Sequence, residues 1–492
     1  MSSQEMRNWL GQRAYITPTR TALVYEGKEW SYEELDQASR HLANQLSGIG
    51  VEHGQHVAFL MGNCPETVIL IHAIHYLNAV MVPLNVRLSP YELTYQLDDS
   101  DTDWLIVDLQ HSKLADELQF DQTFFIDDVK NAKQRDARTE ETIHLDSLHS
   151  IIYTSGTTGK AKGVMLTYGN HWWSATGSAL NLGIHEGDRW LCCVPLFHVS
   201  GLSIVMRSVM YGTAIVLHQS FDPFTFNQSI HQDRITIASV VTVMLSNALD
   251  RENGAPYPAS FRCMLLGGGP APLPLLDACK AMNVPVFQTY GLSESASQIV
   301  TLAPEDSLRK LGSAGKPLLP SQLKIVSETD QSEGEIFIKG PNVTKGYYKK
   351  ETVNKETFHD GWLATGDVGY LDEEGFLYVL DRRKDLFISG GENVYPAEIE
   401  ACLIGHEAVA EAGVSGVDSE KWGKVPAAFI VLKKGAHVTT DQLIAHCEEH
   451  LAKYKAPQRI QIVDSLPRNA SNKLVRRDLQ SLLKGENVHD ER

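Results

Sequence analysis

Residues 153–164 read YTSGTTGKAKGV, a segment that concentrates small hydroxyl side chains, glycines and two lysines. Glycine lets backbone N–H groups approach an anion closely, the hydroxyls add further donors, and lysine adds positive charge. The segment follows an apolar run, so we expect it at the end of a strand. These features predict a loop that cradles phosphate groups. Its expected binding residues are Thr154, Ser155, Gly156, Thr157, Thr158 and Lys160.

A Walker A loop is the main alternative for such a segment, because it also binds phosphate through glycines and a lysine. That motif requires G-x-x-x-x-G-K-[ST]. Here Lys160 is followed by Ala161, and Thr154 stands in the place of the first glycine. The segment therefore does not fit a Walker A loop. An ordinary turn rich in glycine and threonine is disfavoured by the length and density of the segment.

Seven further segments follow a recognisable order along the chain. They are residues 195–201 (PLFHVSG), 267–272 (GGGPAP), 289–294 (TYGLSE), 365–367 (TGD), 381–385 (DRRKD), 389–393 (SGGEN) and 467–473 (PRNASNK). With the phosphate loop, they resemble the acyl-adenylate-forming superfamily, which includes acyl-CoA synthetases, nonribosomal adenylation domains and firefly-type luciferases. The resemblance runs from about Arg20 to Leu479. Two positions depart from it, since the family usually has proline at Ala161 and glycine at Asp381.

The resemblance implies how the chain would bind ATP. The ring of Tyr290 would stack on adenine, the two carboxylate oxygens of Asp367 would accept from both ribose hydroxyls, and Glu294 would bind Mg²⁺. Outside the phosphate loop, the expected ATP- or AMP-binding residues are Gly268, Gly269, Pro270, Thr289, Tyr290, Gly291, Ser293, Asp367 and Arg382.

The resemblance also implies two successive half-reactions with ATP and coenzyme A as co-substrates. A carboxylic acid first attacks the α-phosphorus of ATP, and an acyl-adenylate forms with release of pyrophosphate. The coenzyme A thiol then displaces AMP after the C-terminal domain has rotated about a hinge. The expected catalytic residues are Lys473, His198, Glu294 and Lys384, where Lys384 is the pivot, and Gly390 and Gly391 would line the coenzyme A channel.

Arg207 lies nine positions after His198, in the otherwise apolar residues 202–209. A buried arginine needs a partner, and a second carboxylate on the substrate would be one; a structural ion pair with Asp or Glu is the alternative. This arginine and the FHVSG segment resemble the o-succinylbenzoate–CoA ligases of menaquinone biosynthesis. The expected substrate-binding residues are His198, Ser200, Arg207, Gly268 and Ser295.

Two other functions stay open at this point. A medium-chain or aryl monocarboxylate–CoA ligase would use the same nucleotide chemistry without a second substrate carboxylate. A catalytically silent nucleotide-binding protein of the same fold would lack at least one charged group of the site, whereas Lys160, Glu294, Asp367, Arg382 and Lys473 are all present. The sequence therefore favours an active enzyme.

Strand-like and helix-like segments alternate along most of the chain, which predicts an α/β fold. Strands are expected at residues 57–61, 80–84, 104–108, 151–154, 190–194, 214–217, 238–243 and 263–266. Because these strands are apolar on both faces, we expect mostly parallel sheets covered by helices. Residues 1–381 are predicted to form a large N-terminal adenylation domain, within which residues 323–380 form a small antiparallel, barrel-like subdomain. Residues 382–385 are the predicted hinge, and residues 386–492 a small mobile α+β C-terminal domain.

Composition narrows the class of protein further. The chain has 492 residues, 44 of them basic and 61 acidic, with a net charge of −17. This balance argues against nucleic-acid or anionic-membrane binding. Seven scattered cysteines do not form a disulfide framework, and no stretch of about 20 apolar residues occurs. We expect a cytoplasmic enzyme whose partners are a small carboxylic acid, ATP and coenzyme A, with homo-oligomer formation left open.

Overall fold

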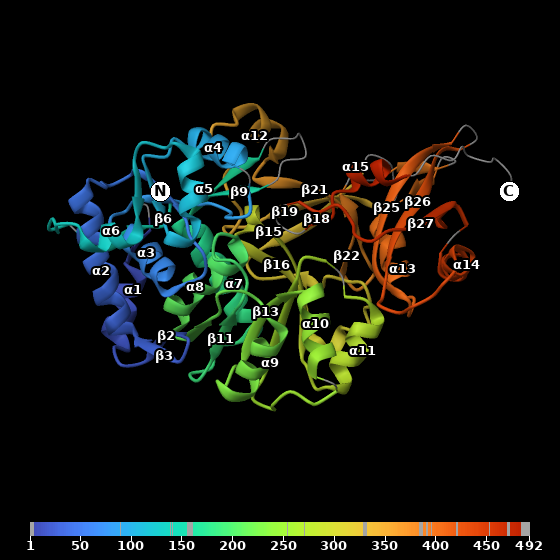
Figure 1. Cartoon of the computed structure of the whole chain (residues 1–492), viewed down its shortest axis with the longest axis horizontal. Helices are drawn as coiled ribbons and strands as arrows, with labels where there is room; N and C mark the ends of the chain where they lie inside the picture. Colours follow the sequence, from blue (N-terminus) through green and yellow to red (C-terminus); the bar gives the residue numbers. More distant parts are fainter. Residues whose placement is uncertain are drawn as a thin grey trace.

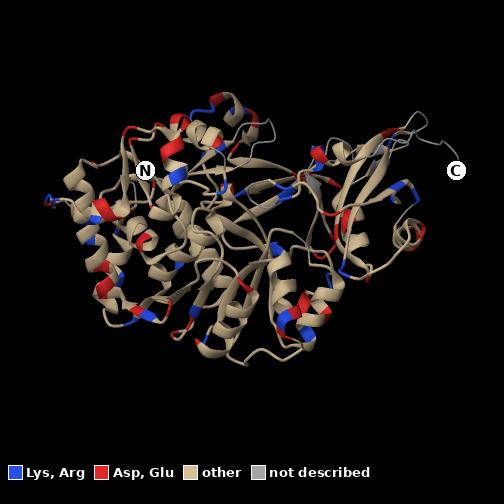
Figure 2. Ribbon diagram, in the orientation of Figure 1, with Lys and Arg blue, Asp and Glu red and all other residues tan. Residues whose placement is uncertain are grey.

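The computed structural model describes residues 4–88, 90–137, 139, 141–154, 161–252, 254–269, 271–327, 332–382, 387–389, 392–394, 396–419, 422–451, 453–469 and 473–483. The N-terminal part forms a large body of sheets and helices, and the C-terminal part forms a smaller body at one end of it (Figure 1). Acidic and basic residues are interspersed along both bodies (Figure 2). Among the described residues, no helix combines the length and apolar composition needed to cross a bilayer.

The first large sheet has six strands in the order β10-β9-β5-β4-β6-β7. They are β4 (His56–Leu60), β5 (Val80–Pro83), β6 (Trp104–Val107), β7 (Thr123–Phe125), β9 (Leu148–Thr154) and β10 (Lys162–Thr167). All neighbours are parallel except β9 and β10, which run antiparallel. The helices of this region are α1 (Trp9–Ile16), α2 (Tyr32–Ile49), α3 (Pro65–Tyr76), α4 (Pro90–Asp99), α5 (Ser112–Leu118), α6 (Ile126–Asn131) and α7 (Tyr168–Leu182). The short strands β1 (Glu5–Arg7) and β8 (Thr142–His144) pair separately.

The second large sheet has nine strands in the order β17-β16-β15-β14-β13-β11-β12-β2-β3. They are β2 (Thr21–Tyr25), β3 (Lys28–Ser31), β11 (Arg189–Cys192), β12 (Ala214–Leu217), β13 (Ile237–Val241), β14 (Cys263–Gly267), β15 (Val286–Leu292), β16 (Ser297–Leu302) and β17 (Lys316–Pro317). Its central strands are parallel. Helices α8 (Val199–Tyr211), α9 (Pro223–Gln232), α10 (Thr242–Glu252) and α11 (Leu273–Ala281) alternate with these strands along the chain.

Both faces of the nine-stranded sheet are buried, as two adjacent cysteines show. Cys192 packs in the cluster that contains Trp190 and Met206, whereas Cys193 packs in the cluster that contains Leu191 and Phe226. Successive side chains on a strand point to opposite faces, so each cysteine fills a different layer of the core. Both cysteines are therefore buried core residues.

A five-stranded antiparallel sheet follows in the chain. It consists of β18 (Gln322–Val326), β19 (Gly334–Lys339), β20 (Phe358–His359), β21 (Trp362–Leu371) and β22 (Leu377–Arg382), with α12 (Glu351–Thr357) inserted between two of its strands. Residues 323–380 were predicted to form a small antiparallel subdomain, and the antiparallel pairing of these strands confirms that prediction.

The smaller C-terminal body is built on a mixed sheet in the order β24-β23-β26-β25, with β27 parallel to β26. Its strands are β23 (Phe387–Ser389), β24 (Glu392–Val394), β25 (Val409–Ser419), β26 (Gly423–Leu432) and β27 (Arg459–Ile462). Its helices are α13 (Pro396–Ile404), α14 (Thr440–His450) and the short α15 (Arg476–Leu479). The predicted α/β fold class, with a large N-terminal and a small C-terminal part, is confirmed.

Local sequence signals explain where several elements begin and end. The Ser31 hydroxyl accepts from the backbone of Glu34, and the Glu34 side chain accepts from the backbone of Ser31, so a capping box starts α2. Strand β11 ends at Cys192, two residues before the predicted end. The side chain of Asn63 accounts for this difference, since it donates to the backbone oxygen of Val194 over 3.0 Å. The backbone therefore leaves the sheet there and enters the segment that carries His198.

Candidate functional site

The predicted phosphate loop joins two antiparallel strands at one edge of the six-stranded sheet. Thr154 at the end of β9 is paired with Lys162 at the start of β10. A Walker A loop instead leads from a strand into a helix, so this connection agrees with the rejection of that motif. Ser155, Gly156, Thr157, Thr158 and Lys160 lie outside the described residues.

The two ends of this loop are anchored to α4, one through Asp99 and the other through Tyr95. The hydroxyl of Tyr153 donates to Oδ2 of Asp99 over 3.0 Å. The hydroxyl of Tyr95 lies 3.2 Å from Oδ1 of Asp99 and 3.2 Å from the backbone oxygen of Ala161. Lys350 forms an ion pair with the same carboxylate. The residues on both sides of the loop are therefore fixed to one helix.

Tyr290 and Asp367 come from different sheets and meet through a hydrogen bond. The hydroxyl of Tyr290, on β15, donates to Oδ2 of Asp367, on β21, over 2.8 Å. Burial and the neighbouring Asp367 carboxylate raise the pKa of the Tyr290 hydroxyl well above its ordinary value, so it remains a donor. Asp367 is only 5% exposed. The structure thus brings together the two residues expected at adenine and ribose.

Glycines shape the backbone beside Tyr290 at two positions. Gly268 has a φ of +87°, a region that side chains with a Cβ rarely adopt. A Cβ on Gly291 would lie 2.1 Å from the backbone oxygen of Ser297, so only glycine fits there. The backbone N–H of Ala271 donates to the side chain of Gln288 over 3.3 Å, which ties the end of the glycine loop to β15. Gly268, Gly269 and Thr289 therefore belong to one neighbourhood, and Pro270 lies outside the described residues.

Glu294 lies in the short 3₁₀ turn after β15 and contacts a residue that the sequence did not single out. The hydroxyl of Tyr347 donates to Oε1 of Glu294 over 2.8 Å. The ammonium of Lys162 lies 5.2 Å from the centre of the Tyr347 ring, so Tyr347 contacts both the Glu294 carboxylate and the strand that leaves the phosphate loop. Glu294 is partly exposed, and its turn contacts β10, the strand that follows the predicted phosphate loop. Its hard oxygen donors suit Mg²⁺, so Glu294 fits the expected metal ligand.

The two serines on either side of Glu294 differ in their surroundings. Ser295 is fully buried, and its hydroxyl lies 2.7 Å from the backbone oxygen of Ser297 and accepts from the backbone N–H of Leu292 over 2.9 Å. The Ser295 side chain thus stabilises the turn internally. Ser293 is partly exposed at the start of the turn.

His198 precedes the first turn of α8 and faces two cations from distant parts of the chain. Burial, together with the positive charges of Lys473 and Arg87, lowers the pKa of His198 to about 4. The imidazole is therefore neutral at physiological pH. Lys473 is held in a tight turn, since its backbone N–H donates to Oδ1 of Asn469 and its backbone oxygen accepts from the Asn469 N–H, both over 2.9 Å. The turn brings a cation of the C-terminal body to the region of His198.

Arg87 was not predicted, although a sequence signal for it exists. It lies four positions after the end of β5, a parallel strand at the centre of the six-stranded sheet. Loops that follow the carboxyl ends of parallel strands commonly line the ligand site of α/β proteins. That rule could have identified Arg87, whereas no local pattern marks Tyr347.

Arg207 is buried within α8 without an acidic partner among the described residues. Its side chain is 2% exposed and lies over the ring of Trp190, 5.5 Å from the ring centre. Its Nε and Nη2 atoms have no hydrogen-bond partner in the described ranges. The structural ion pair considered above is not found there. Ser200, two turns earlier on the same helix, is exposed.

The predicted hinge and coenzyme A residues are described only in part. On β22, the backbone of Arg382 is paired with that of Asp367 on β21. Lys384, Gly390 and Gly391 lie outside the described residues. Strand β21, which carries Asp367, is therefore paired with β22, the strand that leads directly into the predicted hinge.

Comparison with known proteins identifies the relatives of this chain. Residues 10–348 match the family described as AMP-binding enzyme, and residues 398–473 match the AMP-binding enzyme C-terminal domain. The 2-succinylbenzoate–CoA ligase of Geobacillus kaustophilus is 53% identical over 483 residues, which cover 97% of this chain and 98% of that protein.

Two solved structures of the o-succinylbenzoate CoA synthetase (MenE) of Bacillus subtilis are also similar. The complex with the acyl-adenylate intermediate OSB-AMP has a TM-score of 0.93 at 49% identity and covers 98% of this chain and 100% of that chain. A double mutant bound with its product analogue OSB-NCoA has a TM-score of 0.76 at 49% identity, over 97% of this chain and 99% of that chain. By these scores, the overall arrangement of this chain is closer to that of the OSB-AMP complex than to that of the OSB-NCoA complex. By the extent of these matches, the chain belongs to the AMP-binding enzyme family.

Proposed function

We propose that this protein is an ATP-dependent 2-succinylbenzoate–CoA ligase that works through an acyl-adenylate. The curated relatives with this name match along nearly the whole chain. The observation that favours a diacid is the buried guanidinium of Arg207, which has no acidic partner in the described part of the chain. As the sequence resemblance implies, the product would be 2-succinylbenzoyl-CoA, an intermediate of menaquinone biosynthesis.

The nucleotide would bind where Tyr290, Asp367 and Glu294 lie. The face of Tyr290 offers a platform for adenine, while its hydroxyl orients the Asp367 carboxylate toward the ribose hydroxyls. Glu294 would hold Mg²⁺, which when bound neutralises charge on the phosphate oxygens. The phosphate loop would bind the β- and γ-phosphates through its N–H groups, hydroxyls and Lys160.

In the first half-reaction, a carboxylate oxygen of the acid attacks the α-phosphorus of ATP. The bond between this phosphorus and the bridging oxygen of pyrophosphate breaks, and pyrophosphate leaves with the electron pair. Negative charge develops at the α-phosphate, so a positioned cation lowers the barrier. Lys473 is the candidate for that cation, since its charge already acts on His198. Neutral His198 can donate or accept a hydrogen bond at the acid without repelling Lys473.

In the second half-reaction, the thiol of coenzyme A attacks the carbonyl carbon of the adenylate, the thiol proton is lost, and AMP leaves. Lys473 would have to withdraw to give the thiol access. We infer that residues 1–381 and 386–492 form the two moving parts, with residues 382–385 as the hinge and Lys384 as the pivot. The separate family matches at 10–348 and 398–473 support this division. Gly390 and Gly391 would line the channel for the pantetheine arm.

The orientation described here fits adenylate formation better than thioester formation. Lys473 lies near His198. The overall arrangement also resembles the OSB-AMP complex more closely than the OSB-NCoA complex. Both observations support an enzyme that changes the position of its C-terminal body between the two reactions.

A panel of carboxylic acids, scored by pyrophosphate release with MgATP, tests the proposal. We expect 2-succinylbenzoate to be preferred over benzoate and over medium-chain fatty acids, and AMP and 2-succinylbenzoyl-CoA to accumulate when coenzyme A is added. A preference for a monoacid would favour the monocarboxylate–CoA ligase instead. Formation of ADP in place of AMP would contradict the adenylate mechanism altogether.

A further inference from the structure

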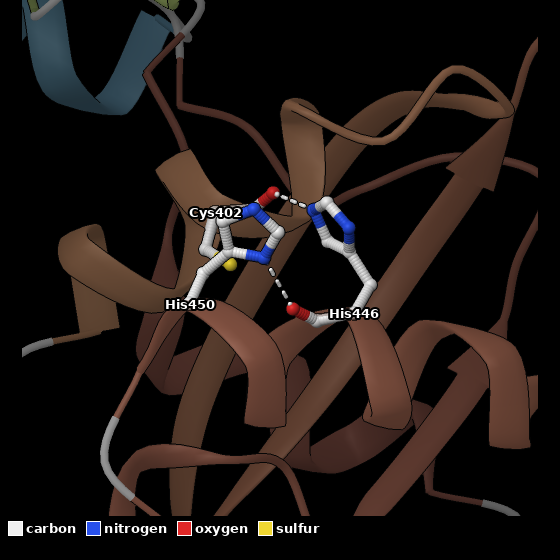
Figure 3. Close-up of side chains that lie close together, drawn as sticks. All are labelled: Cys402, His446 and His450. Atoms are coloured by element: carbon white, nitrogen blue, oxygen red, sulfur yellow. Dashed lines mark hydrogen bonds between the residues drawn. The ribbon is translucent and has the colours of Figure 1, made fainter.

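Two helices of the C-terminal body place a thiol and two imidazoles side by side, away from the residues of the proposed active site. Cys402 lies on α13, and His446 and His450 lie one turn apart on α14. Figure 3 shows the two rings and the thiol gathered between these helices. One candidate ligand atom from each of the three residues lies within 4.8 Å of the other two. No step of the proposed reaction uses these groups.

Backbone hydrogen bonds already select which ring nitrogens carry protons. Nδ1 of His450 lies 2.7 Å from the backbone oxygen of His446, and Nε2 of His446 lies 3.0 Å from the backbone oxygen of Cys402 (Figure 3). A carbonyl oxygen can only accept, so each of these nitrogens is the donor. This leaves Nε2 of His450 and Nδ1 of His446 with a free lone pair. A histidine that binds a metal commonly has its second nitrogen held by such a bond. Nδ1 of His446 lies on the side of its ring turned away from Cys402 and His450 (Figure 3), so this ring has to turn over or exchange its bond to the Cys402 oxygen for the metal.

The three side chains are accessible to a cation. The thiolate is the form of cysteine that binds metals, so binding displaces the proton of the Cys402 thiol. A second cysteine on α14, Cys447, belongs to the core cluster against which Cys402 packs. Cys447 itself is fully buried in the core of this body, whereas Cys402 and His446 are half-buried and His450 is exposed. A cation can therefore reach the three side chains from solvent.

The donor set indicates the class of cation. One sulfur and two imidazole nitrogens suit a borderline-soft divalent metal and disfavour Mg²⁺ or Ca²⁺, which prefer oxygen. In a tetrahedral zinc site, with Zn–N distances of about 2.0–2.1 Å and a Zn–S distance of about 2.3 Å, the ligand atoms lie roughly 3.4–3.6 Å from one another. The three candidate ligand atoms would therefore have to approach one another by about 1 Å. Small rotations about the last torsion of each ring, which is broad, supply such shifts.

We propose that Cys402, His446 and His450 form a binding site for Zn²⁺ or a similar divalent transition metal, with the fourth position open to solvent. The metal links α13 to α14. Helix α13 starts directly after the short strands β23 and β24, on the side of the predicted hinge. Bound metal therefore stabilises the body that moves, without a part in the chemistry at Lys473. The proposal does not depend on the identity of the acid.

The experiment uses the full-length protein, reduced with a phosphine, freed of metal and titrated with Co²⁺. We expect a saturable sulfur-to-cobalt charge-transfer absorption with the d–d bands of a tetrahedral site, and its loss when Zn²⁺ is added, since Zn²⁺ binds more tightly. Cys402→Ser should abolish the charge-transfer band. His446→Ala and His450→Ala should each weaken Co²⁺ binding at least tenfold. Zn²⁺ should raise the thermal midpoint of the wild-type chain and leave that of Cys402→Ser unchanged.

His437→Ala is the matched control, because His437 lies on the same body beside Leu432 and Val438 and outside the cluster. Its Co²⁺ affinity should equal that of the wild type. His450 is exposed, so its replacement tests the site even if Cys402→Ser impairs folding, and an unchanged rate of pyrophosphate release verifies the fold of each variant. No saturable Co²⁺ spectrum in the wild type, or full binding by both His450→Ala and Cys402→Ser, would overturn the proposal.

Discussion

The hydroxyl of Tyr290 donates a hydrogen bond to Oδ2 of Asp367 over 2.8 Å, and so links the end of β15 to the middle of β21. Each strand belongs to a different sheet, and this bond is a polar contact between them at the proposed nucleotide site. It holds the Asp367 carboxylate in one orientation while the ring face of Tyr290 stays available for a base.

Tyr290→Phe keeps the ring but removes this bond. A hydrogen bond to a charged group contributes about 1.5–3 kcal/mol, which corresponds to roughly a ten- to hundredfold change in affinity. We expect the KM for ATP to rise by about this factor, with a smaller change in the KM for the acid. Steady-state kinetics with each substrate varied in turn provides the measurement. An equal rise in both KM values would indicate a general structural defect.

Lys473→Ala should separate the two half-reactions. Loss of one positioned charge at the transition state commonly costs about 10²- to 10³-fold in rate, so adenylate formation should fall at least that far. Conversion of supplied acyl-adenylate to the thioester should be nearly unaffected, because the proposed mechanism gives Lys473 no role in that step. Arg468→Ala, a change on the same C-terminal loop, serves as the control. Equal losses in both half-reactions would refute the role assigned to Lys473.

Arg207→Leu tests whether the buried guanidinium binds a second carboxylate. The substitution removes the charge that we assign to the diacid, so the KM for 2-succinylbenzoate should rise at least tenfold, while that for a monoacid stays similar or falls. The KM for ATP should not change. If the KM for the diacid remained at its wild-type value, Arg207 would have only a structural role beside Trp190.

A cluster of buried histidines predicts acid sensitivity of folding. His75, on α3, lies 4.2 Å from His149, on β9, and His149 lies 4.2 Å from His171, on α7, between ring centres. His72, on α3, adjoins His75. Burial lowers the pKa of His72 and of His171 to about 3, with the Arg207 charge as a further cause for His171. Burial also lowers the pKa of His75 and His149, and the neighbouring imidazoles add to the effect.

The sign of the effect follows from proton binding. Unfolded histidine titrates near about pH 6.5, so below that pH the unfolded chain binds more protons than the folded one. The free energy of unfolding should be greatest above about pH 6.5 and fall as the pH decreases from there toward 3, by about 1.4 kcal/mol per pH unit for each histidine. His72→Leu should reduce the dependence of the unfolding free energy on pH by about 1.4 kcal/mol per pH unit. Denaturant titrations between about pH 7 and pH 5 measure it, and an unaltered slope would contradict the assignment.

The sequence predicted the sheets and the nucleotide motifs because both depend on local patterns. Apolar runs mark buried strands wherever they occur, and the match of β12 with the predicted residues 214–217 illustrates this. The motif around Tyr290 is recognisable for the same reason, since a glycine at 291 is required by the nearby backbone of Ser297.

Contacts between distant segments could not be predicted in this way. Tyr347 reaches Glu294 only because a loop of the antiparallel sheet folds back over β10, and no pattern near Tyr347 signals it. Likewise, the inward orientation of Ser295 depends on backbone atoms of the turn that holds it. The cluster of Cys402, His446 and His450 requires the packing of α13 on α14, although the i, i+4 spacing of the two histidines was visible in the sequence.

The register that pairs Asp367 with Arg382 has a mechanical consequence. Under the proposed mechanism, a nucleotide bound at Asp367 would also restrain β22, the strand that leads into the predicted hinge. Release of AMP would remove this restraint. The return of the C-terminal body to its adenylate-forming position would then depend on an empty ribose site.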